Sequence, residues 1–172
     1  MSTNGSGEEA RVVIPERLTE AAWSPFGWLP VADTDPRDGE HRMTFEWADP
    51  HVNLIGHARA EVPETASGLR CEMLYRHDTH TQALLSLDVP AVIAVAPAGV
   101  EFNDEGDTES IRVFRIEPLE PLVLNRGTWH WGPFPVDAAE VRLYNVQGLR
   151  YSDDNRCVDL AAKGMAVEVE LS

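Results

Sequence analysis

The stretch LRCEMLYRH, from Leu69 to His77, shows the alternation of residue types that decides the fold class. Successive side chains of a β-strand point to opposite faces. This stretch is therefore predicted to place Cys71, Met73, Tyr75 and His77 on one face of a strand and Glu72, Leu74 and Arg76 on the other. The segment Asp78–Thr79–His80 follows as a turn or bulge.

Similar short apolar runs recur along the chain, separated by Pro- and Gly-containing turns. Such spacing favours many short strands over a few long helices. The predicted strands cover residues 41–47, 52–60, 69–77, 82–87, 91–96, 111–116, 122–125, 128–131, 141–146 and 166–171. One short helix is predicted over Thr19–Trp23 with Thr19 as its N-cap. Residues 102–110 read as a surface loop, and Pro133 and Pro135 are expected to break the strand before them.

These segments predict an all-β protein that folds as one barrel with a short N-terminal helix. Residues 1–11 are polar and acidic and are expected to be a disordered tail, and residues 12–172 are expected to form the single barrel domain. A chain of 172 residues is long enough for one well-buried core and short for two.

The charge of the chain excludes two classes of partner. It has 29 acidic and 14 basic residues, a net charge of −15, which would repel nucleic acid and anionic lipid. No apolar run approaches the roughly 20 residues of a membrane span, and residues 1–10 do not resemble a secretory signal. The two cysteines, Cys71 and Cys157, form no CxxC motif. We therefore expect a reduced, cytoplasmic protein with a small-molecule substrate.

Polar residues with chemical potential concentrate in two segments about fifty residues apart. The first is YRHDTHTQ (residues 75–82) and the second is NRGTWHW (residues 125–131). Histidines on neighbouring strands can converge inside a barrel, where they can hold a metal or act as acid and base. His77, Gln82 and His130 are therefore predicted to face the barrel interior.

The spacing within these segments is that of a metal-binding cupin. Such a cupin has His-x-His, then three or four residues and a Glu, and a further His on a later strand. Here Tyr75 stands at the first His position and Gln82 at the Glu position, while His77 and His130 remain. A neutral amide and a protonated phenol are weak ligands, so His77 and His130 predict only a weak or absent metal site.

The remaining histidines match no motif. His80 falls in the predicted turn and is expected to be exposed to solvent. His41, His51 and His57 are scattered over the early strands, which predicts surface or structural roles. Arg76 has the opposite parity to His77 and is expected to form an outward ion pair.

Four segments, in order, resemble the ureidoglycolate lyases, a cupin-fold family once called ureidoglycolate hydrolases. They are LTEAAWSPFGWLPV (residues 18–31), YRHDTHTQALLSL (75–87), LNRGTWHWGPF (124–134) and RCVDL (156–160). The resemblance implies a cupin-type barrel, commonly a homodimer, that splits ureidoglycolate into glyoxylate and urea in purine and allantoin breakdown. Members occur with and without a divalent metal, so the resemblance admits nickel or manganese as a cofactor.

Position by position, five residues match the family's motifs and three depart from them. The matching residues are His77, Gln82, Arg126, Trp129 and His130, and the departures are Tyr75, Asp78 and Trp131. The hypothesis is that His77 or His130 acts as base and that the other histidine or Tyr75 acts as acid. Gln82 would orient the ureido group, Arg126 or Arg76 would bind the carboxylate, and Trp129 and Trp131 would contact the substrate.

Two other interpretations remain open. The departures at Tyr75 and Trp131 suit a catalytically altered cupin that binds a small molecule without turnover. A metal-dependent oxygenase or isomerase would require two histidines and a carboxylate, and the sequence offers no carboxylate at the expected position. The leading prediction is a C–N lyase.

Overall fold

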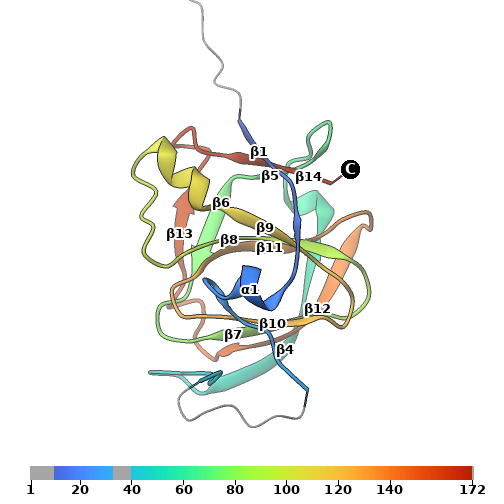
Figure 1. Cartoon of the computed structure of the whole chain (residues 1–172). Coiled ribbons are helices and arrows are strands. Elements are labelled where there is room, and N and C mark those ends of the chain that lie inside the picture. The colour runs from blue at the N-terminus through green and yellow to red at the C-terminus, as the bar shows by residue number, and fades with distance from the viewer. Residues whose placement is uncertain (1–9, 33–39, 172) are drawn as a thin grey trace, which may run out of the picture.

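The computed structural model describes residues 10–32 and 40–171, which form a mainly β structure (Figure 1). The described strands make three sheets. The six-stranded sheet has the order β13 (Arg156–Asp159), β6 (Met73–Arg76), β11 (Trp129–Pro135), β8 (Ala91–Ala96), β9 (Arg112–Ile116) and β2 (Glu16–Arg17). The five-stranded sheet has the order β3 (Gly27–Trp28), β10 (Pro121–Leu124), β7 (Gln82–Ser86), β12 (Glu140–Gly148) and β4 (Pro50–Ala58). The third sheet has the order β1 (Arg11–Val13), β14 (Val167–Glu170) and β5 (Gly68–Cys71).

The six-stranded sheet is buried on both faces. All six residues of its strand β8 are buried. Ile93 and Val95 pack with Leu84 of the five-stranded sheet, whereas Val92 and Ala94 lie in a second apolar cluster shared with β5 and β14. Facing sheets of this kind give the jelly-roll arrangement that the sequence predicts for an all-β, cupin-type barrel.

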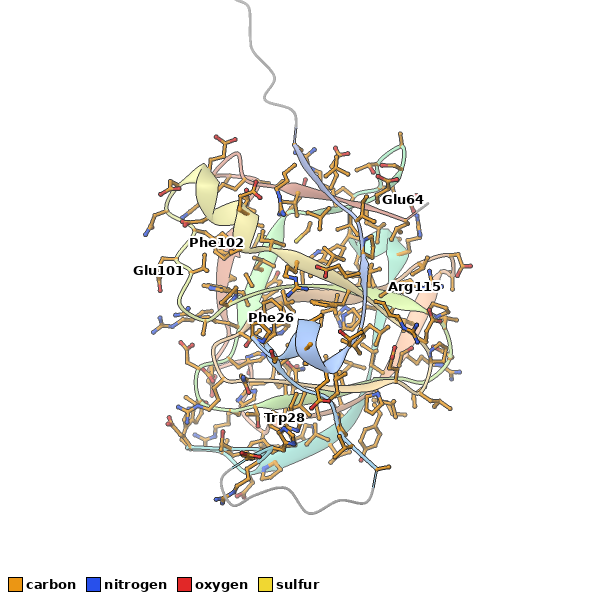
Figure 2. The ribbon with its side chains drawn as sticks, viewed as in Figure 1. Phe26, Trp28, Glu64, Glu101, Phe102 and Arg115 are labelled. Carbon is orange, nitrogen blue, oxygen red and sulfur yellow. The ribbon has the colours of Figure 1, made fainter. Side chains whose placement is uncertain are left out.

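The short helix α1 (Glu20–Trp23) closes one end of the space between the two large sheets (Figure 1). Thr19 is its N-cap, and the Thr19 hydroxyl accepts a hydrogen bond from the Ala22 amide, as predicted. Trp23 is fully buried and donates from its indole N–H to the carbonyl of Val123. Phe26 lies beside the helix (Figure 2) and packs with Trp23 and Phe114. The predicted short N-terminal helix is confirmed.

The predicted strand over Leu69–His77 is wrong in one respect. It is interrupted at Glu72, so that β5 joins the small sheet and β6 joins the six-stranded sheet. The change of partner sheet at Glu72 shifts the alternation of faces by one residue. As a result Cys71 and Leu74 pack in the same apolar cluster, although the sequence placed them on opposite faces.

Two further predictions of strand boundaries are corrected. Residues 41–47 form no strand, and Phe45 makes only an isolated bridge to His80. Strand β11 continues through Pro133 and Pro135 instead of ending before them. A register shift between Trp131 and Phe134 accommodates Pro133, because a bulge leaves a residue without a ladder hydrogen bond.

Both ends of the described chain belong to the folded part. Arg11, expected in the tail, begins β1 and donates to the carbonyl of Thr108; residues 1–9 of the predicted tail lie outside the described residues.

The predicted loop over residues 102–110 contains a 3₁₀ helix (Glu105–Ser110), and Phe102 before it is buried (Figure 2). A second 3₁₀ helix covers Arg59–Glu61. No helix in the described ranges is long and apolar enough to cross a membrane.

Candidate functional site

A cavity of about 550 Å³ lies between the two large sheets. Strands β4, β7 and β12 line one side of it, and β6 and β11 line the other. His77, Gln82 and His130 all line the cavity and are 7%, 6% and 8% exposed. The structure therefore brings together the three residues predicted to face the interior, around a space of the size that small-molecule sites occupy.

Strand register explains why His130 faces the cavity. His130 lies opposite Val95 of β8 on one side and opposite Tyr75 of β6 on the other. Residues directly opposite each other in a sheet project to the same face, and Val95 belongs to the cluster between the two large sheets. His130 and Tyr75 therefore share the inner face, and Tyr75 also lines the cavity.

The two cavity imidazoles have the same tautomer. His77 Nδ1 lies 2.7 Å from the carbonyl oxygen of Asp154, and His130 Nδ1 lies 3.1 Å from that of Thr128. A carbonyl oxygen can only accept, so each Nδ1 carries the proton. Each Nε2 is then left as a proton acceptor, and the centroids of the two rings are 5.3 Å apart.

Burial keeps both rings neutral at pH 7. Desolvation, followed by the nearby His77, lowers the pKa of His130 to about 3. Desolvation also lowers the pKa of His77, but there the carbonyl and the charges of Asp154 and Asp78 oppose it. His77 is therefore the imidazole whose surroundings best support the uptake of a proton.

His80 is buried, which corrects the prediction that it is exposed. It is 4% exposed and stacks on His77 with ring centroids 4.6 Å apart. Its Nδ1 lies 3.6 Å from a carboxylate oxygen of Asp154, and Phe45 stacks on its other side. Desolvation, together with His77, lowers the pKa of His80 to about 4. The burial of His80 could not be predicted from its neighbours in the sequence, because its partner Asp154 is distant in the chain.

Asp154 also holds the turn that carries His80. Its carboxylate accepts hydrogen bonds from the amides of Asp78 and Thr79 and from the Thr79 hydroxyl. Burial alone would raise the pKa of Asp154, but these hydrogen bonds together lower it below its ordinary value. The ionised carboxylate and the Asp154 carbonyl thus fix the segment from His77 to His80.

Three hydrogen-bonded amide side chains lie at the opposite wall. The Gln82 amide nitrogen donates to Asn145 Oδ1 at 2.8 Å and to Gln147 Oε1 at 3.3 Å. All three residues are buried, and Gln82 and Gln147 line the cavity. Buried amides need hydrogen-bond partners, and the sequence analysis identified only Gln82 of this group.

Two predicted substrate-binding residues do not line this cavity. Arg126 is exposed and bonds to the carbonyl of Asp78 and to the carboxylate of Glu46. Trp129, one residue from His130, points to the other face of the sheet, where its indole N–H donates to the carbonyl of Val100. Trp131 is buried against Phe134 and does contribute to the cavity wall.

Arg76, the alternative cation for the carboxylate, lies on the same far face as Trp129. It pairs with Asp78 as expected, with Nε 3.1 Å from Oδ1, but it is only 8% exposed. The predicted ion pair is present, but the prediction that Arg76 points outward to solvent is wrong. The guanidinium is buried because it packs over the Trp129 ring, 4.5 Å from the ring centroid.

Several cavity residues were missed from the sequence, among them His57, Arg70 and Glu72. His57 of β4 lines the cavity and packs edge-on against Phe134, and desolvation lowers its pKa. Arg70 and Glu72 also line it, because the interruption at Glu72 turns both toward the cavity. Among the described lining residues Arg70 is the only Arg or Lys, and it pairs with Glu72 at 3.3 Å. The position of His57 could have been predicted, because it lies two residues after the apolar Ile55 and therefore points to the same face of the strand.

The donor set does not fit the metal site predicted on His77 and His130. Tyr75 and Gln82 add only a phenol and a neutral amide, both weak ligands. Over the part of the chain that the structure describes, no three His, Cys, Asp or Glu side chains form a group that could hold an ion. A nickel or manganese ion bound at His77 and His130 would have two imidazole ligands, where three or four strong ligands are usual.

The family comparison decides what kind of protein this is. The sequence model of the ureidoglycolate lyase family matches residues 37–168. The chain belongs to the ureidoglycolate lyase family. The resemblance inferred from the sequence is thus confirmed, and the match includes every residue of the cavity discussed above.

No curated protein sequence matches this ureidoglycolate lyase family member. Among solved structures it is similar to a dTDP sugar isomerase from Desulfovibrio desulfuricans G20, with a TM-score of 0.44 and 11% sequence identity. That similarity covers 79% of this chain and 78% of the isomerase chain.

Proposed function

We propose that this protein is a lyase that cleaves the carbinolamide C–N bond of ureidoglycolate to give glyoxylate and urea. The observation that supports this best is the pair of buried, neutral imidazoles, His77 and His130, with free Nε2 atoms beside the Tyr75 side chain on one cavity wall. The reaction needs one proton removed and one proton supplied, and these groups can do both.

The proposed steps conserve protons and electrons. His77 Nε2 removes the proton from the substrate hydroxyl, and the oxygen lone pair forms the C=O bond of glyoxylate. The C–N bond breaks, its electron pair goes to the nitrogen, and the Tyr75 hydroxyl protonates that nitrogen to release urea. Transfer of the proton from His77 to the Tyr75 phenolate then restores the starting state. The low pKa of His130 suits it to accept a hydrogen bond and not a proton.

Arg70 replaces Arg126 and Arg76 in the proposal as the residue that binds the substrate carboxylate. Arg70 lines the cavity, where its Nε lies 3.3 Å from a Glu72 carboxylate oxygen and its Nη1 lies 3.8 Å from one of Glu168, so Nη2 is the nitrogen for which no ion pair is found among the described residues. Guanidinium groups bind carboxylates well because they donate two parallel hydrogen bonds. A local cation is required because the net charge of −15 disfavours an anionic substrate.

The test is a glyoxylate-release assay with ureidoglycolate and the purified protein. We expect release, and we expect it to be unchanged by EDTA treatment or by added nickel or manganese, because the described residues contain no group of three His, Cys, Asp or Glu side chains that could hold these ions. Glyoxylate release that requires an added metal would refute the metal-independent steps. Binding of substrate without release would instead support the second candidate, a binding cupin whose aromatic wall contains Trp131 and Phe134.

A homodimer and a role in ureide breakdown also belong to the proposal. The outer face of the five-stranded sheet carries exposed apolar side chains, with Leu54 and Tyr144 opposite each other and 70% and 42% exposed. Exposed apolar groups on a sheet are typical of a contact between subunits. Sedimentation of the wild type and of Leu54→Glu would test this, since the charge should shift a dimer toward the monomer.

A further inference from the structure

The amide side chains of three neighbouring strands form one connected ladder. Gln82 is on β7, Asn145 and Gln147 are on β12, and Asn53 is on β4. Asn145 and Asn53 are directly opposite each other in the strand register. Gln82, Asn145 and Gln147 are 6%, 0% and 4% exposed. The ladder therefore crosses the cavity wall within the protein interior.

The hydrogen bonds of the ladder fix which way the Gln82 amide points. Asn145 donates from Nδ2 to Asn53 Oδ1 at 2.8 Å, so its own Oδ1 faces Gln82. Gln82 Nε2 uses its two hydrogens on Asn145 Oδ1 and Gln147 Oε1. A reversed Gln82 amide would bring its oxygen against these two oxygens and lose both bonds.

The orientation leaves one buried acceptor without a partner. Gln82 Oε1 has no hydrogen-bond partner in the described part of the protein, although the residue lines the cavity. A buried acceptor left unpaired is unfavourable. A ligand N–H would donate a hydrogen bond to this oxygen, whereas a ligand carbonyl or carboxylate oxygen would be repelled by it.

We propose that Gln82 Oε1 accepts a hydrogen bond from the terminal carbamoyl NH₂ of the substrate, and that Asn145, Gln147 and Asn53 are positioning residues that hold it for this contact. The identity of the substrate rests on the function proposed above. The preference for a carbamoyl group rests on the ladder alone. The ladder would also set the direction of binding, with the substrate carboxylate pointing away from Gln82.

Two matched ligands test this preference without turnover. N-carbamoylglycine and N-acetylglycine differ only in a terminal NH₂ or CH₃, and neither has the hydroxyl group that cleavage requires. Titration calorimetry with the full-length protein is expected to show at least tenfold tighter binding of N-carbamoylglycine. Sites built to hydrogen-bond a ligand group strongly reject analogues that lack it.

Variants separate recognition from a merely structural role. Gln82→Met keeps the length of the side chain without the acceptor and should bind the two ligands within about twofold of each other. Asn145→Leu frees the Gln82 amide to reverse and should reduce the preference, whereas Asn145→Asp keeps an acceptor for Gln82 Nε2 and should retain it. Asn103→Leu, on an exposed residue outside the cavity, is the matched control and should behave as the wild type.

The outcomes decide between the two proposals. Equal binding of both ligands by the wild type, binding of neither, or an unchanged preference in Gln82→Met would overturn the role of the ladder. A purely structural role would weaken both ligands equally in Asn145→Leu and leave their ratio unchanged, which would also overturn it. Failure of wild-type protein to release glyoxylate from ureidoglycolate would overturn the lyase proposal but not the measured preference.

Discussion

The two walls of the cavity are built from different chemistry. The six-stranded sheet and the segment that follows β6 supply the imidazoles of His130 and His77, and His80 stacks on His77. Burial lowers the pKa of all three imidazoles. The five-stranded sheet supplies the amides of Gln82 and Gln147, which do not titrate. The imidazoles of the first wall can exchange protons, whereas the Gln82 and Gln147 amides can only donate and accept hydrogen bonds. The second wall also holds one imidazole, His57 of β4, whose pKa is lowered by desolvation.

This difference suggests a division of work in the proposed reaction. Groups that exchange protons act in the chemical step, so their loss should lower kcat. Groups that only orient the substrate act equally in the ground state and the transition state, so their loss should raise KM. Substitutions on the two walls are therefore expected to separate in steady-state kinetics.

The largest effect is expected from the imidazole wall. His77→Gln keeps a polar side chain but removes the proposed base, and kcat for glyoxylate release should fall by about 10²–10⁴-fold. Binding of N-carbamoylglycine should stay within about threefold of the wild type. His41→Gln, on an exposed histidine that stacks on Trp28 outside the cavity, is the control and should keep full activity. A loss of binding as large as the loss of kcat would show that His77 acts in recognition.

The imidazole wall should also make the stability depend on pH. His130 has a pKa of about 3 in the folded protein and about 6.5 when unfolded, so the unfolded state binds more protons below pH 6.5. Stability is then fully present above pH 6.5 and is lost as the pH falls. From pH 7 to pH 5 this group alone should lower the free energy of unfolding by about 2 kcal/mol.

Urea unfolding of wild type and His130→Gln at both pH values measures this contribution. The variant should lose about 2 kcal/mol less than the wild type over the same interval. Gln82→Met, on the amide wall, should show the wild-type pH dependence, because it removes no titrating group. Identical pH dependence in wild type and His130→Gln would mean that His130 is not buried as a neutral ring.

The sequence predicted the imidazole wall better than the amide wall, for physical reasons. His77 and His130 stand in segments with recognisable spacing, and both line the cavity as predicted. Trp129 was wrongly assigned to the same site, although strand alternation turns it to the face opposite that of His130. Asn145 and Gln147 stand in an apolar strand with no motif, and only the pairing of β7 with β12 brings them to Gln82.

Features that depend on distant contacts could not be predicted. The burial of His80 requires Asp154 from a later loop, and the position of Arg70 requires the change of sheet at Glu72. Neither the loop contact nor the interruption leaves a pattern in the local sequence. The alternation over residues 69–77 looks continuous, although its two halves pair with different sheets.

Arg70 lies beside Glu72 and should have an intermediate effect. Arg70→Met keeps most of the apolar stem but removes the proposed carboxylate contact, so KM for ureidoglycolate should rise about tenfold. The ratio of KM between Arg70→Met and wild type should be smaller at high ionic strength, because salt weakens the interaction of the wild-type guanidinium with the substrate carboxylate. Arg115→Met, on an exposed residue that pairs with Glu117 and is labelled in Figure 2, is the control and should leave KM unchanged.

The smallest effect is expected at the far end of the amide ladder. Asn53 contacts Asn145 and not Gln82, so Asn53→Ala should loosen the orientation of Asn145 while both hydrogen bonds from Gln82 remain available. KM should rise about threefold with kcat unchanged, in keeping with the modest net value of one such hydrogen bond. The effect should therefore decrease along the ladder from Gln82 to Asn145 to Asn53. A larger effect at Asn53 than at Asn145, measured in the same steady-state assay, would contradict this order, because an amide that acts only through its neighbour cannot matter more to the substrate than that neighbour does.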